Sequence, residues 1–394
     1  MISAKACSLY FLLVVSLFIT QGCNTFDEPE PAGNASYIKF IGGAKDETVN
    51  RGLQYSDGGF ILVGESASFM TQGTDAYVAR TDNSGNLLWE KTFGGSGADA
   101  FSDVKEVNGE LLVFGYVTDT ANQRDFLLMR LDAAGSLLDS LTFGNPDIDE
   151  TGRYLLPGQS GNYTLIGVKG YNETSTDIFT VRLQSDFQVE WQQSYGLLEK
   201  FDEIGNVLEA PNGNLIWCGT VSTGSATHSR VVSTSPYGQP VWVVTYGETD
   251  AVDESAIMLQ KGWGSYYVLL SNSENNSGDI TLRFIDKNGE QIGADKTFGD
   301  ENANQASGLC LTSDGGYAIT GTTEAGIENS DVLLVRTNSQ GDELWTQTYG
   351  GSGIDRGSFV EEDRDQGLAI FSTISFENNT VFGLIKTDSE GNTF

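Results

Sequence analysis

Histidine, proline and basic residues are scarce in this sequence. One histidine, His228, and 7 prolines occur in 394 residues, and 22 Lys and Arg stand against 54 Asp and Glu. The formal net charge of −32 repels phosphate backbones, so it argues against nucleic-acid binding. It favours cations, basic proteins or neutral glycans as partners, although solubility alone would also explain it. A single histidine, interpreted as a polar loop residue, supports no Ser-His-Asp set.

Cysteine is nearly as rare, with four residues in the chain. Cys7 and Cys23 precede the folded part, and Cys218 and Cys310 fall in non-adjacent units of the repeat described below. Their spacing matches no metal-ligand pattern. We therefore predict that Cys218 and Cys310 are buried free thiols.

Long apolar runs are absent except at the N-terminus. Residues 9–19 are apolar but too short to cross a bilayer as a stable helix, and Lys5 precedes them. The segment Thr20-Gln21-Gly22-Cys23 resembles a bacterial lipobox, although Thr20 stands where Leu is usual. We predict a signal peptide over residues 1–22 and an acylated Cys23 with a flexible acidic tether over 23–36. The expected location is the outer membrane, on its periplasmic face or at the cell surface; an ordinary signal peptide cut nearby is the alternative.

Glycine, in contrast, is abundant and regularly placed. An aromatic-Gly or Ile-Gly step recurs every 50 to 52 residues, with its glycine at Gly42, Gly94, Gly144, Gly196, Gly247, Gly299 and Gly350. Within each unit, short apolar segments alternate with turn sequences such as Asn108-Gly109, which supply the positive φ of tight hairpins. Four strands per unit and no helical period predict an all-β, seven-bladed β-propeller of four-stranded antiparallel blades.

A second landmark lies between the expected third and fourth strands. The pattern Asp82-x-x-Gly85-x-x-x-Trp89 recurs with Trp242 and Trp345. It resembles the repeat of quinoprotein-like propellers and, more closely, the W-x-K-T-[FY]-G-G repeats of exported Bacteroidota-type proteins. This resemblance implies the fold rather than an activity. A quinoprotein-like redox enzyme is a third functional hypothesis. We interpret the tryptophans as packing between blades.

The two ends of the repeat predict how the ring closes. The last unit stops at residues 387–394, where its fourth strand should begin, whereas residues 37–42 match the fourth-strand segment 89–94. The N-terminal strand should therefore complete the last blade, with Tyr37 in the tryptophan position, so that no sheet edge stays open. The propeller is predicted to span residues 37–394.

Small residues recur in the expected first strands, at Gly52, Ser102, Gly152, Gly205, Ala256, Gly308 and Gly357. We expect them to let seven strands converge around a narrow axial channel.

Acidic residues precede these first strands in nearly every unit. Aligned on the landmark glycines, they are Asp46, Asp99, Asp149, Asp202, Asp253 and Asp355, with Asn304 in the remaining unit. A ring of carboxylates at one mouth of the channel would attract a basic partner or bind Ca²⁺ as a cofactor. The alternative is that each Asp caps its own loop by accepting backbone N–H groups.

Residues that break the repeat point to contacts with a partner. Trp263, Tyr266 and Tyr267 replace the usual Asp-Gly-Gly hairpin of the fifth unit. Exposed aromatic rings stack on sugars or anchor protein interfaces, whereas burial would make them core residues. We predict a non-enzymatic binding or scaffolding module for a protein or glycan partner, such as an outer-membrane protein complex. The alternative is a carbohydrate-active enzyme that uses carboxylates at the channel mouth.

Overall fold

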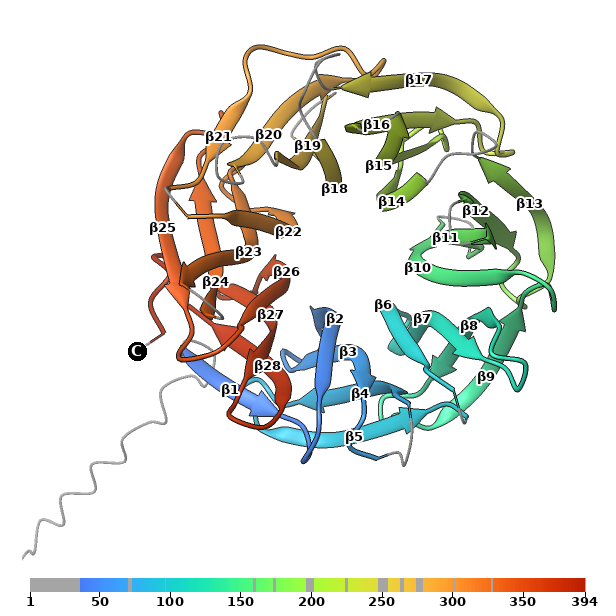
Figure 1. Cartoon of the computed structure of the whole chain (residues 1–394), viewed down its shortest axis with the longest axis horizontal. Helices are drawn as coiled ribbons and strands as arrows, with labels where there is room; N and C mark the ends of the chain where they lie inside the picture. The colour runs from blue at the N-terminus through green and yellow to red at the C-terminus, as the bar shows by residue number, and fades with distance from the viewer. Residues whose placement is uncertain are drawn as a thin grey trace, which may run out of the picture. The chain divides into compact units, whose positions relative to one another are not determined.

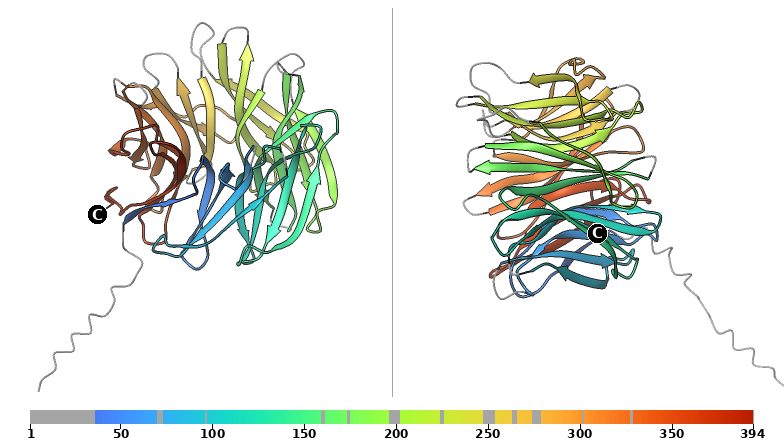
Figure 2. Two further views of the ribbon diagram at one scale, coloured as in Figure 1. Left: turned by 60° about the horizontal axis from the view of Figure 1, so that its bottom comes forward. Right: turned by 90° about the vertical axis from the view of Figure 1, so that its right-hand side faces the viewer.

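The computed structural model describes residues 36–69, 73–95, 97–158, 161–172, 175–195, 202–223, 226–246, 254–262, 266–273, 279–300, 302–326 and 329–393. In these ranges the chain forms 28 β-strands in seven four-stranded antiparallel sheets, arranged as blades around an axis (Figure 1). Figure 2 shows the blades from the side. The predicted fold class is confirmed. No helix in the described ranges is long and apolar enough to span a membrane, and Cys23 lies outside them.

Each blade has an inner, a second, a third and an outer strand. The inner strands are β2 (Glu47–Gln54), β6 (Ala100–Val107), β10 (Asp149–Pro157), β14 (Asp202–Glu209), β18 (Glu254–Lys261), β22 (Asn304–Leu311) and β26 (Arg356–Glu362). The second strands are β3 (Phe60–Ser66), β7 (Glu110–Thr118), β11 (Tyr163–Asn172), β15 (Leu215–Thr223), β19 (Tyr266–Ser273), β23 (Tyr317–Gly326) and β27 (Leu368–Ser375). The third strands are β4 (Asp75–Thr81), β8 (Arg124–Leu131), β12 (Ser175–Leu183), β16 (Ala226–Thr234), β20 (Asp279–Asp286), β24 (Asn329–Thr337) and β28 (Thr380–Lys386). The outer strands are β5 (Leu87–Phe93), β9 (Leu137–Phe143), β13 (Val189–Tyr195), β17 (Pro240–Tyr246), β21 (Lys296–Phe298), β25 (Glu343–Tyr349) and β1 (Tyr37–Ile41).

The ring closes as predicted. Strand β1 pairs with β28, from Tyr37 opposite Lys386 to Ile41 opposite Phe382, so the first strand is the outer strand of the last blade (Figure 1). The Tyr37 hydroxyl also donates to the carbonyl of Asn83 in the next blade, at 3.2 Å. Both ends of the propeller are thereby fixed in one sheet.

The tryptophans pack between blades, as the repeat predicts. Each ring lies against the turn glycine between the third and outer strands of the following blade. A Cβ on Gly135 would approach the ring of Trp89 to 2.8 Å, and one on Gly289 would approach Trp242 to 2.9 Å. The Trp89 Nε1–H donates to the carbonyl of Ala133 at 3.1 Å. Tyr37 occupies the same place against Gly85.

The hydrophobic core is divided among the blade interfaces. One cluster joins Ile61 and Val78 of the first blade to Phe101 and Val113 of the second, and all four are buried. Each blade is covered on both faces by its neighbours. The side chains that alternate between the two faces along a strand must therefore be apolar on both. Burial of such side chains contributes about 25 cal/mol per Å² of apolar surface.

Every inner strand contains a β-bulge at the same height. The pairing register with the second strand shifts around Asn50, Ser102, Arg153, Gly205, Ile257, Ser307 and Ser358. Four of these residues donate a side-chain hydrogen bond to the inner strand of the next blade: Asn50 to Phe101 O, Ser102 to Gly152 O, Ser307 to Gly357 O and Ser358 to Val49 O. The bulges thus connect neighbouring blades close to the axis.

The small residues of the inner strands occupy several positions relative to the bulge. Gly152 and Gly357 precede the bulge, Ser102 and Gly205 form it, and Gly308 follows it. A Cβ on Gly152 would lie 2.2 Å from the carbonyl oxygen of Gly115 in the neighbouring blade. At this glycine the close approach of an adjacent blade, rather than crowding at the axis, excludes a side chain.

The bulge contacts predict a measurable contribution to stability. Ser358→Ala removes the 2.7 Å hydrogen bond to Val49 O that joins the last blade to the first. We expect the free energy of unfolding, measured by chemical denaturation, to fall by about 1 kcal/mol. Ser140→Ala on the exposed outer strand β9 is the matched control and should be neutral. An equal loss in both variants would contradict the role of the bulge.

Candidate functional site

Where the structure describes the predicted acidic ring, its carboxylates accept hydrogen bonds from backbone N–H groups. Asp99 is fully buried, and its two carboxylate oxygens accept the N–H groups of Gly95 at 2.6 Å and Thr118 at 2.7 Å. Asp355 accepts the N–H groups of Gly351 at 3.0 Å and Ser375 at 2.7 Å. These bonds correspond to the loop-capping alternative.

Asp46 and Asp149 lie one residue away from that buried position. Both are exposed; Asp46 accepts the N–H of Thr380 at 3.0 Å, and Asp149 that of Arg124 at 2.9 Å. The following residues, Glu47 and Glu150, are buried instead and accept the loop N–H groups of Gly43 and Asn145. Glu47 and Glu150 thus occupy the position of Asp99 and Asp355, three residues before the bulge of the inner strand.

The rest of the ring is described only in part. Asn304 is buried and donates to the Asp300 carboxylate and the Asn302 carbonyl. The side chain of Asp202 and the whole of Asp253 lie outside the described residues.

A second set of acids, which the sequence analysis missed, faces the first. Several third strands carry an aspartate within their first three residues: Asp75, Asp125, Asp279 and Asp331. Oxygen Oδ1 has no hydrogen-bond partner among the described residues in Asp75, Asp125 and Asp331. The sequence contains a pattern that could have indicated these aspartates. In several units an arginine stands five residues after the aspartate, as in Asp75-x₄-Arg80 and Asp331-x₄-Arg336.

The landmark glycines leave room for these paired acids. A Cβ on Gly94 would lie 2.7 Å from Asp75 Oδ1 and 2.2 Å from Asp99 Oδ2. Burial, and then the neighbouring carboxylate of Asp99, raises the pKa of Asp75. Burial and Asp355 raise the pKa of Asp331 in the same way. In each pair, the ionised form of one carboxyl is therefore disfavoured by burial and by the neighbouring carboxylate.

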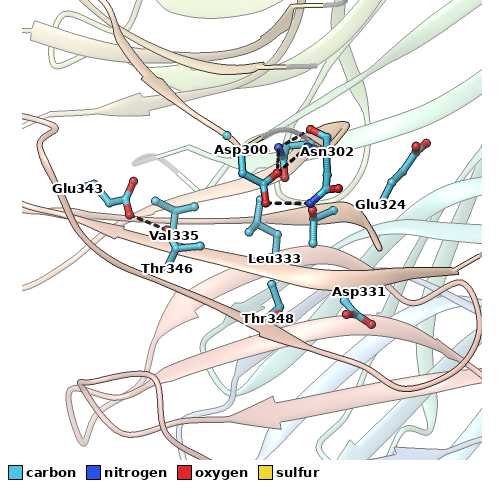
Figure 3. Close-up of a pocket in the computed structure, with 12 residues that line it drawn as sticks. Asp300, Asn302, Glu324, Asp331, Leu333, Val335, Glu343, Thr346 and Thr348 are labelled. Carbon is cyan, nitrogen blue, oxygen red and sulfur yellow. Dashed lines mark hydrogen bonds between the residues drawn. The ribbon is translucent and has the colours of Figure 1, made fainter. Parts of the chain in front are cut away.

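Asp331 also lines a cavity of about 360 Å³ between the fifth and sixth blades (Figure 3). Asp300, Glu324 and Glu343 share this cavity with it. Hydrogen bonds from the backbone of Asn302 and the side chain of Asn304 lower the pKa of Asp300, and Glu343 accepts from the Thr346 hydroxyl. Nowhere in the described ranges do three or more His, Cys, Asp or Glu side chains gather as metal ligands.

The predicted aromatic contacts are partly core residues. Tyr267 is buried against Leu269 and Cys218, and the Tyr266 hydroxyl lies 3.2 Å from that of Tyr317. Both tyrosines line a cavity of about 400 Å³ between the fourth and fifth blades, together with Trp242. Trp263 lies outside the described residues.

His228 and the two cysteines are buried. His228 lies within β16, paired with Val221, rather than in the expected loop. Cys218 and Cys310 are buried free thiols, as predicted, and burial raises the pKa of each to about 12.

The most unusual grouping of polar residues lies in the axial channel. A cavity of about 390 Å³ is lined by residues of six of the seven inner strands, β2, β6, β10, β14, β22 and β26. Its charged lining residues are Arg51, Asp103, Lys105, Glu361 and Glu362, and Tyr154, Leu156, Leu208 and Phe359 supply its rings and much of its apolar wall. Among the side chains that the structure describes, these charges come from three consecutive blades, the last, the first and the second.

Asp103 organises this group, which we call the channel cluster: Arg51, Asp103, Lys105 and Glu361. Its carboxylate is buried, lies 3.3 Å from Arg51 Nε and 2.7 Å from Lys105 Nζ, and accepts the Leu155 N–H at 2.9 Å. The Arg51 guanidinium also stacks on Phe359, with Cζ 3.8 Å from the ring centroid. One anion thereby orients two cations.

Burial shifts the ionisation of the other two members. It lowers the pKa of Lys105, against the attraction of Asp103. It raises the pKa of Glu361 to about 7, although that carboxylate accepts the Gln54 N–H and interacts with Arg51 and Lys105. The channel therefore holds an acid that titrates near neutral pH beside an amino group of lowered pKa.

The bulges explain why the sequence analysis missed this cluster. The residues just after the bulge differ in every blade: Arg51, Asp103, Tyr154, Asn206, Met258, Gly308 and Phe359. A bulge inserts one residue and reverses the alternation of side chains along the strand. A simple alternating pattern therefore does not reveal which residues face the axis.

Comparison with known proteins identifies the fold. No protein-family model and no curated protein matches this chain. A periplasmic gluconolactonase from Pseudomonas aeruginosa superimposes with a TM-score of 0.51 at 13% identity, covering 82% of this chain and 87% of that one. An ulvan lyase, a polysaccharide lyase bound to -[GlcA(1-4)Rha3S]-, has a TM-score of 0.51 at 11% identity over 73% and 80% of the two chains. A protein of unknown function from Dyadobacter fermentans has a TM-score of 0.50 at 11% identity, over 90% and 99%.

These neighbours have different functions, so the similarity establishes the propeller fold and not an activity.

The paired acids predict how stability depends on pH. A carboxyl whose pKa is raised by folding stabilises the fold at acid pH, and this contribution is lost as the pH rises through the raised pKa. Asp75→Asn removes the ionisable group, as Asn304 does naturally in its pair. We expect a higher melting temperature than wild type at pH 7 and little difference at pH 3.5, whereas exposed Asp147→Asn should change neither. A lower melting temperature for Asp75→Asn at pH 7 would refute the shared-proton interpretation.

Proposed function

We propose that this chain is a membrane-anchored, non-enzymatic binding propeller whose binding site is the axial channel. One observation carries the proposal: the charged residues that break the repeat converge on the 390 Å³ channel cavity. The repeated acids, in contrast, are occupied by backbone N–H groups of their own loops. A rigid symmetric scaffold with one asymmetric polar cavity is suited to ligand recognition.

The proposed partner is a glycan, or a segment of an outer-membrane protein, that reaches into the channel. A cavity of this volume accommodates one sugar ring or one side chain rather than a folded domain. Two of the chain's 22 basic residues line it, on a protein with 54 acidic residues. The inter-blade cavity beside Trp242, Tyr266 and Tyr267 offers a second contact for the same partner.

A lipid anchor would hold the propeller at the outer membrane, on its periplasmic face or at the cell surface. The support is the lipobox-like Thr20-Gln21-Gly22-Cys23 after an apolar segment, followed by the acidic tether over residues 23–36. The propeller, over residues 37–394, would then be free to reorient above the bilayer.

Calcium has less support than a direct partner contact. Hard cations take six to eight oxygen ligands, whereas Asp99 and Asp355 already direct both carboxylate oxygens to backbone donors. Calcium at the acidic ring would have to use the exposed Asp46 and Asp149.

A second candidate function is a carbohydrate-active enzyme. The observation in its favour is Glu361, whose pKa is raised by burial to about 7, in the same cavity as Lys105, whose pKa burial lowers. Such a pair suits proton transfer at neutral pH. The catalytic carboxylate would then lie inside the channel rather than in the acidic ring.

Filling the channel tests the proposed binding site. Leu156→Trp adds bulk to the cavity wall without changing a charge. We expect affinity purification from native membranes, followed by mass spectrometry, to recover the partner with wild type and to lose it with this variant. Leu137→Trp on the exposed outer strand β9 is the control and should retain the partner.

Undiminished recovery with Leu156→Trp would refute the channel as the binding site. Turnover of a glycan by the purified wild type, lost in Glu361→Gln, would favour the enzyme instead.

The anchor makes a separate prediction. Cys23→Ala should shift the protein from the membrane fraction to the soluble fraction, because the acylated residue is absent. Mass spectrometry of the wild-type N-terminus should find a diacyl or triacyl Cys23. An unmodified N-terminus at another residue would contradict lipidation.

A further inference from the structure

Arg51 and Lys105 have N–H donors that are not used within the channel cluster. Arg51 contacts Asp103 through Nε, and among the described residues no oxygen accepts from its two terminal nitrogens. Lys105 donates to Asp103, which leaves two of its three N–H groups for other acceptors. Because Arg51 and Lys105 line the cavity, these donors are available to a ligand there.

Among the described residues, Asp103 is the one carboxylate that forms an ion pair with the two cations of the cavity. Asp103 balances one of the two cations, and its other oxygen is taken by the Leu155 N–H. Glu362 is occupied elsewhere, since it accepts the N–H and hydroxyl of Ser313. With Glu361 protonated, Arg51 and Lys105 therefore share a single paired carboxylate, and a carboxylate on a ligand would supply a second one.

Two contacts hold the Arg51 guanidinium in a fixed orientation. Its stacking on Phe359 and its contact with Asp103 fix the plane of the group, so less side-chain entropy is lost on binding. A planar guanidinium with two parallel N–H donors matches a carboxylate in bidentate geometry.

The remaining lining suits a small molecule with both polar and apolar faces. Tyr154 brings a hydroxyl to the wall, and Leu156, Leu208 and Phe359 supply apolar surface. Hydroxyl groups on the ligand would find partners on one side, and its carbon skeleton would contact the other.

We propose that the axial channel binds a small hydroxylated carboxylic acid, with its carboxylate held by Arg51 and Lys105. This rests on the proposed function, because it names the chemical group that the channel recognises. Free sugar acids and uronic acid residues of a glycan share this chemistry.

Binding should depend on pH through Glu361. The groups that act on its carboxyl are Arg51 of β2, Lys105 of β6, Cys310 of β22 and Asp363 at the end of its own strand. An ionised Glu361 repels the ligand carboxylate and pairs with the cations, so affinity should decrease as the pH rises through the pKa of about 7.

Isothermal titration calorimetry with glucuronate tests the proposal, and glucose is the uncharged control. We expect glucuronate to bind wild type at pH 6 and glucose to bind at least roughly ten-fold more weakly, since one charge-assisted bidentate contact is missing. Arg51→Gln and Lys105→Gln should each weaken glucuronate binding by a similar factor. Glu361→Gln should bind glucuronate with little change between pH 6 and pH 8.

Thermal unfolding of each variant establishes that it folds. Arg51→Gln retains the Lys105 and Leu155 contacts of Asp103, so it is the variant expected to keep the native fold. A glucuronate-containing oligosaccharide, titrated in parallel, distinguishes the two ligand sources: tighter binding than glucuronate indicates a glycan, and no binding indicates a free acid.

Two results would overturn the proposal: equal affinity for glucose and glucuronate, or no binding of glucuronate or its oligosaccharide by wild type. If Leu156→Trp nevertheless abolished partner recovery, the channel would remain the binding site with a different ligand chemistry. If partner recovery survived Leu156→Trp, the proposed function itself would fail.

Discussion

The β-bulge in each inner strand is the feature on which the organisation of the propeller depends. It brings a side chain such as that of Ser358 to the carbonyl of the next blade, so that blades are joined near the axis by hydrogen bonds as well as by their apolar faces. It also sets which side chains face the channel, because residues that follow the bulge in six of the seven inner strands line the cavity. One backbone irregularity thus serves both assembly and the presentation of a variable set of residues.

The distribution of charge follows from this division. Acids that recur from blade to blade accept loop N–H groups, such as those of Gly95 and Gly351. Several of them face a second buried acid without a basic partner among the described residues, a cost that a shared proton reduces. Basic residues are few, and two of them meet Asp103 at the axis. The repeated charges therefore belong to the scaffold, whereas the unrepeated ones form the candidate site.

The sequence predicted the fold well because its strongest signals are steric. The landmark glycines, the Trp89 and Trp242 positions and the match of residues 37–42 to an outer strand all reflect close contacts that only certain side chains allow. The site was harder to predict. Asp46 and Glu47 are adjacent acids, and only the loop geometry decides which one is buried. The channel cluster is divided among three blades, and each bulge reverses the side-chain alternation that would place its members at the axis.

The closing strand has a mechanical consequence. Strand β1 is the first strand of the chain, and it is held to β28 by five paired residues, from Tyr37 opposite Lys386 to Ile41 opposite Phe382. A lipid anchor at Cys23 would transmit any pull from the membrane first to this strand. The load would fall on the β1–β28 ladder and on the Tyr37 contact to Asn83 before it reached the inner strand β2. The same strand that seals the ring would then be the point at which tension opens it.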